Sequence, residues 1–293
     1  MKKLTFGMLF ITFLLFLGLG TFSNPMIANT VDTTDAQRDL YLNIITCNKP
    51  QYEMVKSIVG DKHNVEYMFL TEKESKDFIF NDETINNISN MDLFFYSGND
   101  FEPWSGKLIN KLNKSNLGTI DISRGIRVIQ QQTDNGNKEN IYFYPGLEEY
   151  KIVLYNIKSA IQDKDPKNRT LYEENYNKVI ENIDKKINKM KENKKDLAQY
   201  KFISLDDKLD YFYRGIGISP IKVTNNKTIE SVIKDNKLDP TKVIVLKDRE
   251  TPMTEVGYKV VTLDRYDGNS DVQDLIEKNY KSFYDLIELN ENK

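Results

Sequence analysis

Apolar and polar positions follow a helical period over a long stretch in the middle of the chain, residues 166–197. Apolar or aromatic side chains recur there at steps of three and four, at Leu171, Tyr172, Tyr176, Val179, Ile180, Ile183, Ile187 and Met190. Lysine and glutamate occupy much of the opposite face, so the pattern predicts a helix with one buried stripe. Pro166 suits the first turn, where no amide donor is needed, and neither Gly nor Pro interrupts the interior. A helix of about thirty residues is ~45 Å long. We therefore expect a spine that bridges two globular halves, with a solitary coiled coil as the alternative.

Shorter apolar runs on both sides of the spine predict strands that alternate with helices. Before it, we expect strands at residues 41–47, 64–70, 91–96 and 119–122, and helices at 50–59, 82–89, 104–112 and 147–161. After it, we expect strands at 200–205, 221–223, 243–246 and 260–263, and helices at 209–215, 228–236 and 272–289. Such alternation is typical of βαβ units with parallel strands. The predicted fold class is α/β, with two lobes of mostly parallel sheets joined by a long backbone helix.

The first 28 residues differ from this pattern. Lys2 and Lys3 precede an apolar run at residues 6–20, and small or polar residues follow up to Ala28. This is the plan of a secretory signal peptide, and the run is short for a membrane span. An uncleaved anchor is the competing interpretation. The predicted organisation is a signal peptide (1–28), a flexible leader (29–40), an N-terminal lobe (41–146), connecting helices that include the spine (147–199) and a C-terminal lobe (200–293).

Composition narrows the class of protein. The chain has a formal net charge of −3 and 29% charged residues, which fits a soluble body and gives no sign of nucleic-acid binding. Its single cysteine, Cys47, lies in a predicted strand, far from the cleavage region where an exported protein would carry a lipid. Its single histidine, His63, lies in a polar turn and is expected to be solvated. No zinc site of the Cys2His2 type can be built from these residues.

Several short motifs occur in an order that points to one family. They are GDK at residues 60–62, NMDLFFYSG at 90–98, FEPW at 101–104, DPKN at 165–168, YEEN at 172–175, LDD at 205–207 and VVTLD at 260–264. Together they resemble the solute-binding proteins of bacterial zinc and manganese ABC importers, a family that includes metal-binding lipoproteins and adhesins. The resemblance covers residues 42–287. It implies a periplasmic-binding-protein-like fold with a helical backbone, export to the cell surface, periplasm or extracellular space, a membrane permease as partner and a monomeric state.

The resemblance also implies where a metal ion would bind. The family holds its ion with two histidines, then a histidine or an acid, then an acid. The matching positions in this chain are Lys76, Asn140, Asp206 and Asp264. Both acidic positions are kept and both imidazoles are lost, so the metal site is altered.

Three interpretations of this altered site remain open. In the first, Lys76 is a cleft cation that replaces the metal and bridges Asp206 and Asp264. In the second, those acids and the Asn140 oxygen bind a hard divalent cation weakly, which would be the only cofactor. In the third, the site is decayed or has been re-used for another solute.

The sequence predicts a binding protein rather than an enzyme. It contains no GxSxG, P-loop or dinucleotide-binding turn, and no histidine near the acids that could serve as a general base. The favoured function is that of an exported solute-binding protein of a zinc/manganese-type ABC importer with an altered metal site. The alternative is an adhesin or scaffold that does not bind metal.

Overall fold

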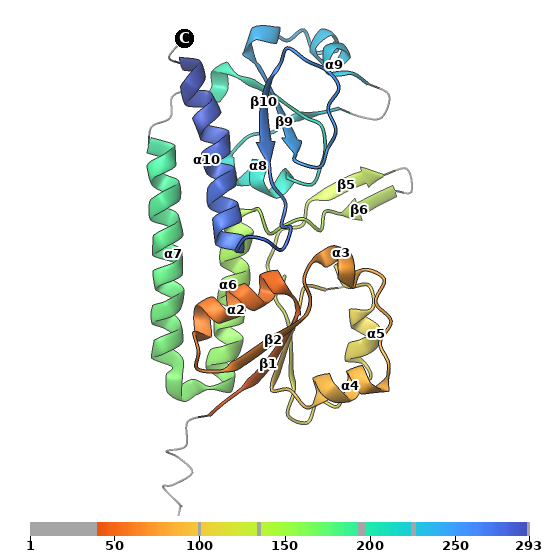
Figure 1. Ribbon diagram of the computed structural model, residues 1–293, viewed down its shortest axis with the longest axis vertical. Coiled ribbons are helices and arrows are strands. Elements are labelled where there is room, and N and C mark those ends of the chain that lie inside the picture. Colours follow the sequence, from red (N-terminus) through yellow and green to blue (C-terminus); the bar gives the residue numbers. More distant parts are fainter. Residues whose placement is uncertain (1–39, 99–100, 134–135, 193–196, 224–226, 292–293) are drawn as a thin grey trace, which may run out of the picture. The chain divides into compact units, whose positions relative to one another are not determined.

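The computed structural model describes residues 40–98, 101–133, 136–192, 197–223 and 227–291 (Figure 1). The predicted signal peptide and nearly all of the predicted leader lie outside the described residues. The elements below belong to one compact unit, Tyr41–Lys293. Within the described ranges, every helix is too short or too polar to span a membrane.

The N-terminal lobe contains a four-stranded parallel sheet. Its strands are β1 (Asn43–Asn48), β2 (Asn64–Phe69), β3 (Leu93–Tyr96) and β4 (Gly118–Asp121), in the order β2-β1-β3-β4. The helices between them are α2 (Lys49–Val59), α3 (Glu72–Ser75), α4 (Asp82–Ser89) and α5 (Ser105–Ile109). Helix α2 begins where the Asn48 side chain accepts a hydrogen bond from the Gln51 amide, and it ends at Gly60, whose φ is 58°.

The C-terminal lobe repeats this plan. Its strands are β7 (Lys201–Ser204), β8 (Ile221–Lys222), β9 (Val243–Asp248) and β10 (Lys259–Leu263), all parallel and in the order β10-β9-β7-β8. Its helices are α8 (Asp210–Ile216), α9 (Ile229–Asp235) and α10 (Val272–Glu291), with short 3-10 turns at Leu197–Gln199 and Pro240–Lys242. The α/β class and the two-lobed parallel architecture predicted from the sequence are confirmed.

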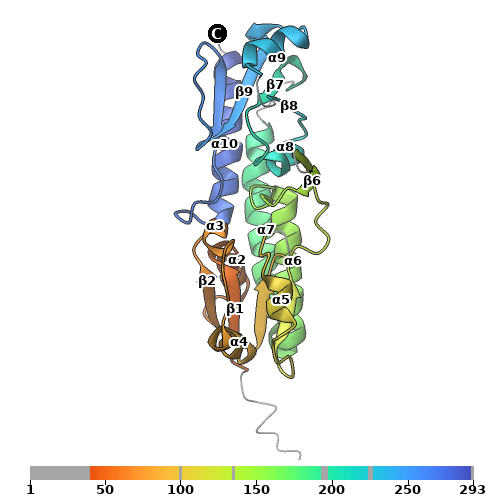
Figure 2. The ribbon, with the colours of Figure 1, turned by 90° about the vertical axis from the view of Figure 1, so that its right-hand side faces the viewer.

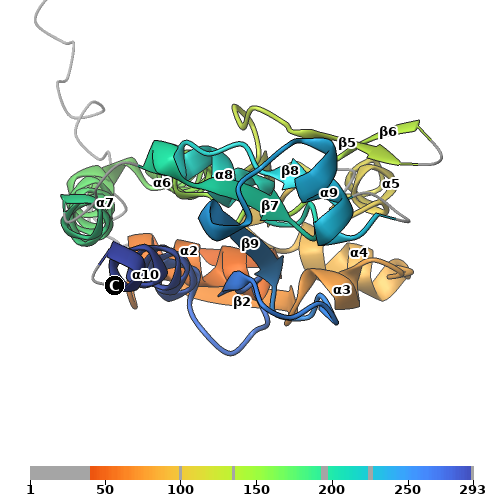
Figure 3. The same ribbon diagram turned by 90° about the horizontal axis from the view of Figure 1, so that it is seen from above.

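The spine forms as predicted in type and nearly in extent. Helix α6 (Leu147–Lys164) leads through a 3-10 turn (Pro166–Asn168) into α7 (Arg169–Glu192), which buries Tyr172, Ile183 and Ile187. Helix α7 packs against α6, against α2 of the N-terminal lobe and against α10 of the C-terminal lobe (Figure 3). Because α7 contacts both lobes, one hydrophobic core runs from residues of the first sheet through the spine to residues of the second.

A second connection between the lobes joins α2 to the loop before α10. The Lys49 ammonium donates to the Gly268 carbonyl at 2.7 Å. The Glu53 carboxylate accepts hydrogen bonds from the Tyr266 hydroxyl at 3.0 Å and from the Val272 amide at 3.2 Å. A short antiparallel hairpin, β5 (Gln130–Thr133) and β6 (Gly136–Glu139), lies beside α8 (Figures 1 and 2).

The expectation that His63 is solvated is wrong. The His63 side chain is buried, because α7 packs over the turn that carries it and places Tyr172 against the imidazole. His63 Nδ1 accepts from the Leu42 amide at 3.3 Å, and Nε2 lies 2.6 Å from the Tyr172 hydroxyl. That hydroxyl donates to Asp165 Oδ2 at 2.5 Å, so a neutral imidazole with its proton on Nε2 satisfies the whole chain of hydrogen bonds.

This network predicts a loss of stability in mild acid. Burial lowers the pKa of His63 from its usual value, although the nearby Asp165 carboxylate opposes the shift. The unfolded chain therefore binds a proton at a higher pH than the folded protein, and the stability contributed by His63 is lost as pH falls below about 6.5. Urea unfolding at pH 7 and pH 5 will measure this. We expect the stability difference between wild type and His63→Gln to shrink at pH 5. A difference that does not change with pH would contradict the expectation.

Candidate functional site

Three acids gather at the carboxyl edge of the C-terminal sheet. Asp206 follows β7, Asp248 ends β9 and Asp264 follows β10. This edge is the usual ligand-binding edge of a parallel sheet. Backbone and hydroxyl groups hold Asp206: its Oδ2 accepts from the Asp248 amide at 2.8 Å and from the Thr251 hydroxyl at 3.0 Å. Its Oδ1 accepts from the Lys208 amide at 3.0 Å. Both oxygens of the Asp206 carboxylate are therefore engaged.

Asp264 is held by two cations. Arg249 donates to it with two nitrogens, the second at 3.1 Å from Oδ2, and the Lys278 ammonium lies 2.6 Å from Oδ2. Burial alone would raise the pKa of the Asp264 carboxyl, but the bonds from Arg249 and Lys278 outweigh it and hold the pKa below its usual value. Asp264 therefore stays ionised and paired.

Asp248 is the most deeply buried of the three acids, with 1% of its side chain exposed. Arg265 Nε donates to Asp248 Oδ2 at 2.7 Å, and the Lys208 ammonium lies 3.6 Å away. The Arg265 guanidinium also pairs with Glu250 and lies over the Tyr142 ring, 5.5 Å from its centre. Because Tyr142 precedes α6, this stacking connects the acidic edge to the segment that links the lobes.

The ion pairs cross between the two neighbouring strands β9 and β10. Arg249, just after β9, pairs with Asp264, whereas Arg265, just after β10, pairs with Asp248. Sequence reasoning missed Asp248, both arginines and Lys278. One signal was present: an Asp-Arg doublet occurs at the end of each strand, at 248–249 and 264–265.

The structure brings Asn140 to this region but leaves Lys76 outside the ion pairs. The buried Asn140 amide donates to the Asp207 carbonyl at 2.7 Å and accepts from the Tyr142 amide at 2.9 Å. Lys76 is exposed in the turn after α3, and within the described ranges it forms no ion pair with Asp206 or Asp264. The convergence of all four residues stays a prediction. Among the described residues, no group of three or more His, Cys, Asp or Glu side chains could hold a metal ion.

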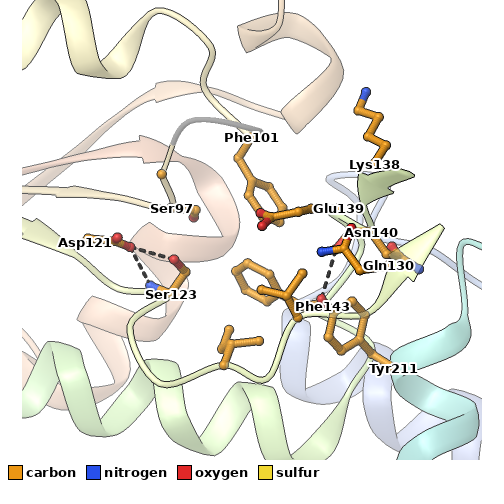
Figure 4. A pocket seen from close by; sticks show the side chains of 13 residues that line it. Ser97, Phe101, Asp121, Ser123, Gln130, Lys138, Glu139, Asn140, Phe143 and Tyr211 are labelled. Carbon is orange, nitrogen blue, oxygen red and sulfur yellow. Dashed lines mark hydrogen bonds between the residues drawn. The ribbon is translucent and has the colours of Figure 1, made fainter. Parts of the chain in front are cut away.

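A cavity of about 630 Å³ is lined in part by Asn140 (Figure 4). Ser97, just after β3, and Asp121, at the end of β4, line it from the N-terminal sheet. Glu139 lines it from the β5–β6 hairpin, and Tyr211 lines it from α8 of the other lobe. The cavity thus lies at the carboxyl edge of the first sheet, the edge that corresponds to the acidic edge of the second.

Two parallel α/β lobes tied by a helical spine, with polar groups at the carboxyl edges of both sheets, define a two-lobed binding protein. More specifically, the chain belongs to the family described as zinc-uptake complex component A, periplasmic (ZnuA), which it matches over residues 44–252. The resemblance inferred from the short motifs is thereby confirmed.

Curated relatives agree with this assignment, and solved structures share the fold. The chain is 27% identical over 218 residues to the metal ABC transporter substrate-binding lipoprotein FimA of Streptococcus parasanguinis, covering 72% of this chain and 69% of FimA. It is 26% identical to the manganese ABC transporter substrate-binding lipoprotein PsaA of Streptococcus mitis, covering 90% and 84%. Its fold is similar to that of the Mn²⁺ complex of FpvC from Pseudomonas aeruginosa, with a TM-score of 0.68, 16% identity and coverage of 85% and 99%. It also resembles the Zn(II)-bound ZnuA-like domain of AdcA from Streptococcus pneumoniae, with a TM-score of 0.64, 18% identity and coverage of 85% and 99%.

Proposed function

We propose that this protein is the exported solute-binding component of a zinc/manganese-type ABC importer in which internal cations have replaced the metal ion. It would deliver its solute to a membrane permease as a monomer and would catalyse no reaction. Membership of the family and the names of relatives, which are substrate-binding lipoproteins of metal ABC transporters, support the importer role. The relatives are lipoproteins, whereas the single cysteine of this chain, Cys47, is buried in β1.

The crossed ion pairs at the ends of β9 and β10 are the main support for an altered metal site. Neighbouring carboxylates repel unless a cation lies between them. Here Arg249, Lys278 and Arg265 supply that positive charge. A metal ion would have to displace Arg249 and Lys278 from Asp264 before it gained a ligand there.

The side chains that could act as metal ligands also argue against a bound metal ion. Zinc prefers imidazole or thiolate ligands, and the single histidine is buried against Tyr172 of the spine. A hard cation would prefer oxygens, but both oxygens of Asp206 already accept hydrogen bonds. We therefore expect this edge of the sheet to bind Zn²⁺ and Mn²⁺ weakly or not at all.

Calorimetric titration of the purified, chelator-treated protein with ZnCl2 and MnCl2 tests the altered site. Dissociation constants above about 0.1 mM, in the weak range for oxygen-ligand sites, are expected for both ions. Nanomolar binding of either ion would contradict the replacement of the metal ion by internal cations and would indicate an ordinary metal-binding protein.

The importer role is tested separately, by co-purification with the membrane permease of the organism's importers from detergent-solubilised membranes. Recovery of a permease supports the role. Its absence, with stable attachment to a host or cell-wall surface instead, favours the adhesin or scaffold interpretation.

A further inference from the structure

The cavity beside Asn140 is large enough for a small organic ligand. A water molecule takes about 30 Å³, and pockets for small organic ligands begin near 300 Å³. At about 630 Å³ the cavity falls in the range of organic-ligand pockets. Its lining includes residues from the carboxyl edge of the first sheet, from the β5–β6 hairpin and from α8 of the second lobe (Figure 4).

Two carboxylates give the lining its negative charge. Asp121 Oδ1 accepts from the amide of Ser123 at 2.9 Å and from its hydroxyl at 2.7 Å, which fixes the Asp121 side chain at the end of β4. Glu139 extends from β6 toward Phe101 in Figure 4. Neither acid forms an ion pair with any residue of the described ranges, in contrast to Asp248 and Asp264.

The other charged residue of the lining does not neutralise these acids. The Lys138 side chain is exposed and extends away from the aromatic rings in Figure 4. Because the two carboxylates come from different elements, they can receive two separate positive charges. The lining therefore favours a cationic solute over an anionic one.

Apolar side chains form part of the same lining. Phe101 is half-buried and packs edge-to-face on the buried Phe143, with ring centres 4.7 Å apart. Val128 is exposed at the rim. A short hydrocarbon chain would cover this apolar surface, whereas a hydrated metal ion would not use it.

We propose that this cavity binds a small aliphatic diamine, with one ammonium group for Asp121, the other for Glu139 and the hydrocarbon chain against Phe101. One part of this inference rests on the proposed function: that the bound amine is the solute of the importer. The site is separate from the acidic edge of the second sheet, where Arg249, Arg265 and Lys278 already supply the positive charge.

Calorimetric titration of the purified protein with putrescine tests this inference, with two compounds of the same chain length as controls. We expect saturable binding of putrescine and none of the neutral 1,4-butanediol or of succinate, which carries the opposite charge. Asp121→Asn and Glu139→Gln should each weaken putrescine binding about tenfold or more, because each removes one charge-assisted hydrogen bond. Glu181→Gln, on the exposed face of α7, is the matched control and should leave the affinity unchanged.

The proposal would be overturned by no binding of putrescine, by equal affinity for putrescine and 1,4-butanediol, or by an affinity that neither Asp121→Asn nor Glu139→Gln changes. Displacement of putrescine by an equimolar amount of MnCl2 would also overturn it in favour of a metal site. Binding of putrescine by a protein that recovers no permease and attaches to a surface instead would count against the importer role and would still support the amine site.

Discussion

Replacing Ile183 with proline is expected to unfold the protein. Ile183 lies in the interior of α7 and its side chain is 0% exposed. Proline removes one hydrogen bond of the helix and its ring clashes with the preceding turn, at a cost of ~3 kcal/mol or more. Loss of the buried isoleucine adds about 2–5 kcal/mol. The sum is comparable with the total stability of a typical domain, about 5–15 kcal/mol. Far-ultraviolet circular dichroism and gel filtration will measure the loss of folded protein.

Ile183→Val is the matched control, because it keeps the helix and removes one methylene group. We expect it to cost about 0.5–1.5 kcal/mol in urea unfolding. The proline is expected to affect both lobes, because α7 contacts α2 of the first lobe and α10 of the second. A folded, monodisperse Ile183→Pro protein would show that the lobes do not need the spine.

The elements that the sequence predicted well are those with a strong local signal. The apolar stripe of α7 and the alternating strands and helices needed only periodicity. The start of the spine was less accurate, because the turn after Pro166 closes as a 3-10 helix and the α-helix begins at Arg169. Local propensity does not separate these two kinds of turn, whose hydrogen bonds span three and four residues.

The acids of the candidate site were predictable, and their partners were not. Asp206 and Asp264 could be placed by their motifs, directly after apolar runs that read as strands. The pairing of Arg249 with Asp264, and of Arg265 with Asp248, requires β9 and β10 to be neighbours in the sheet. Sequence spacing alone does not give that neighbour relation, and the family motifs point to Lys76 as the cation instead.

The error at His63 has a similar origin. The residues around it, Asp61, Lys62 and Asn64, are polar, and a polar turn ordinarily lies in water. Tyr172, which contacts the imidazole, is 109 positions further along the chain. The two side chains meet only because α7 packs against α2 and covers the turn that follows it, and no local sequence pattern predicts that packing.

Arg265→Ala is expected to cost about 3 kcal/mol of stability, near the lower end of the range for breaking a buried ion pair. The substitution leaves the Asp248 carboxylate, which is 1% exposed, with the Lys208 ammonium at 3.6 Å as its remaining cation. It also removes the guanidinium from the Tyr142 ring. Urea unfolding at pH 7 gives the loss directly. If the arginines substitute for the positive charge of a metal ion, millimolar MnCl2 should restore part of the lost stability.

Two further variants separate charge from packing at this site. Arg249→Ala should cost about 1 kcal/mol or less, because the Arg249 side chain is 61% exposed and Lys278 stays 2.6 Å from Asp264. Adding Asp248→Asn to Arg265→Ala should recover much of the lost stability, since it removes the unpaired buried charge and keeps the shape of the side chain. Equal losses for Arg265→Ala and Arg249→Ala, with no recovery in the double variant, would show that Arg265 acts through its packing on Tyr142. The acids would then not depend on the ion pairs. That result would also remove the main support for replacement of the metal ion by internal cations.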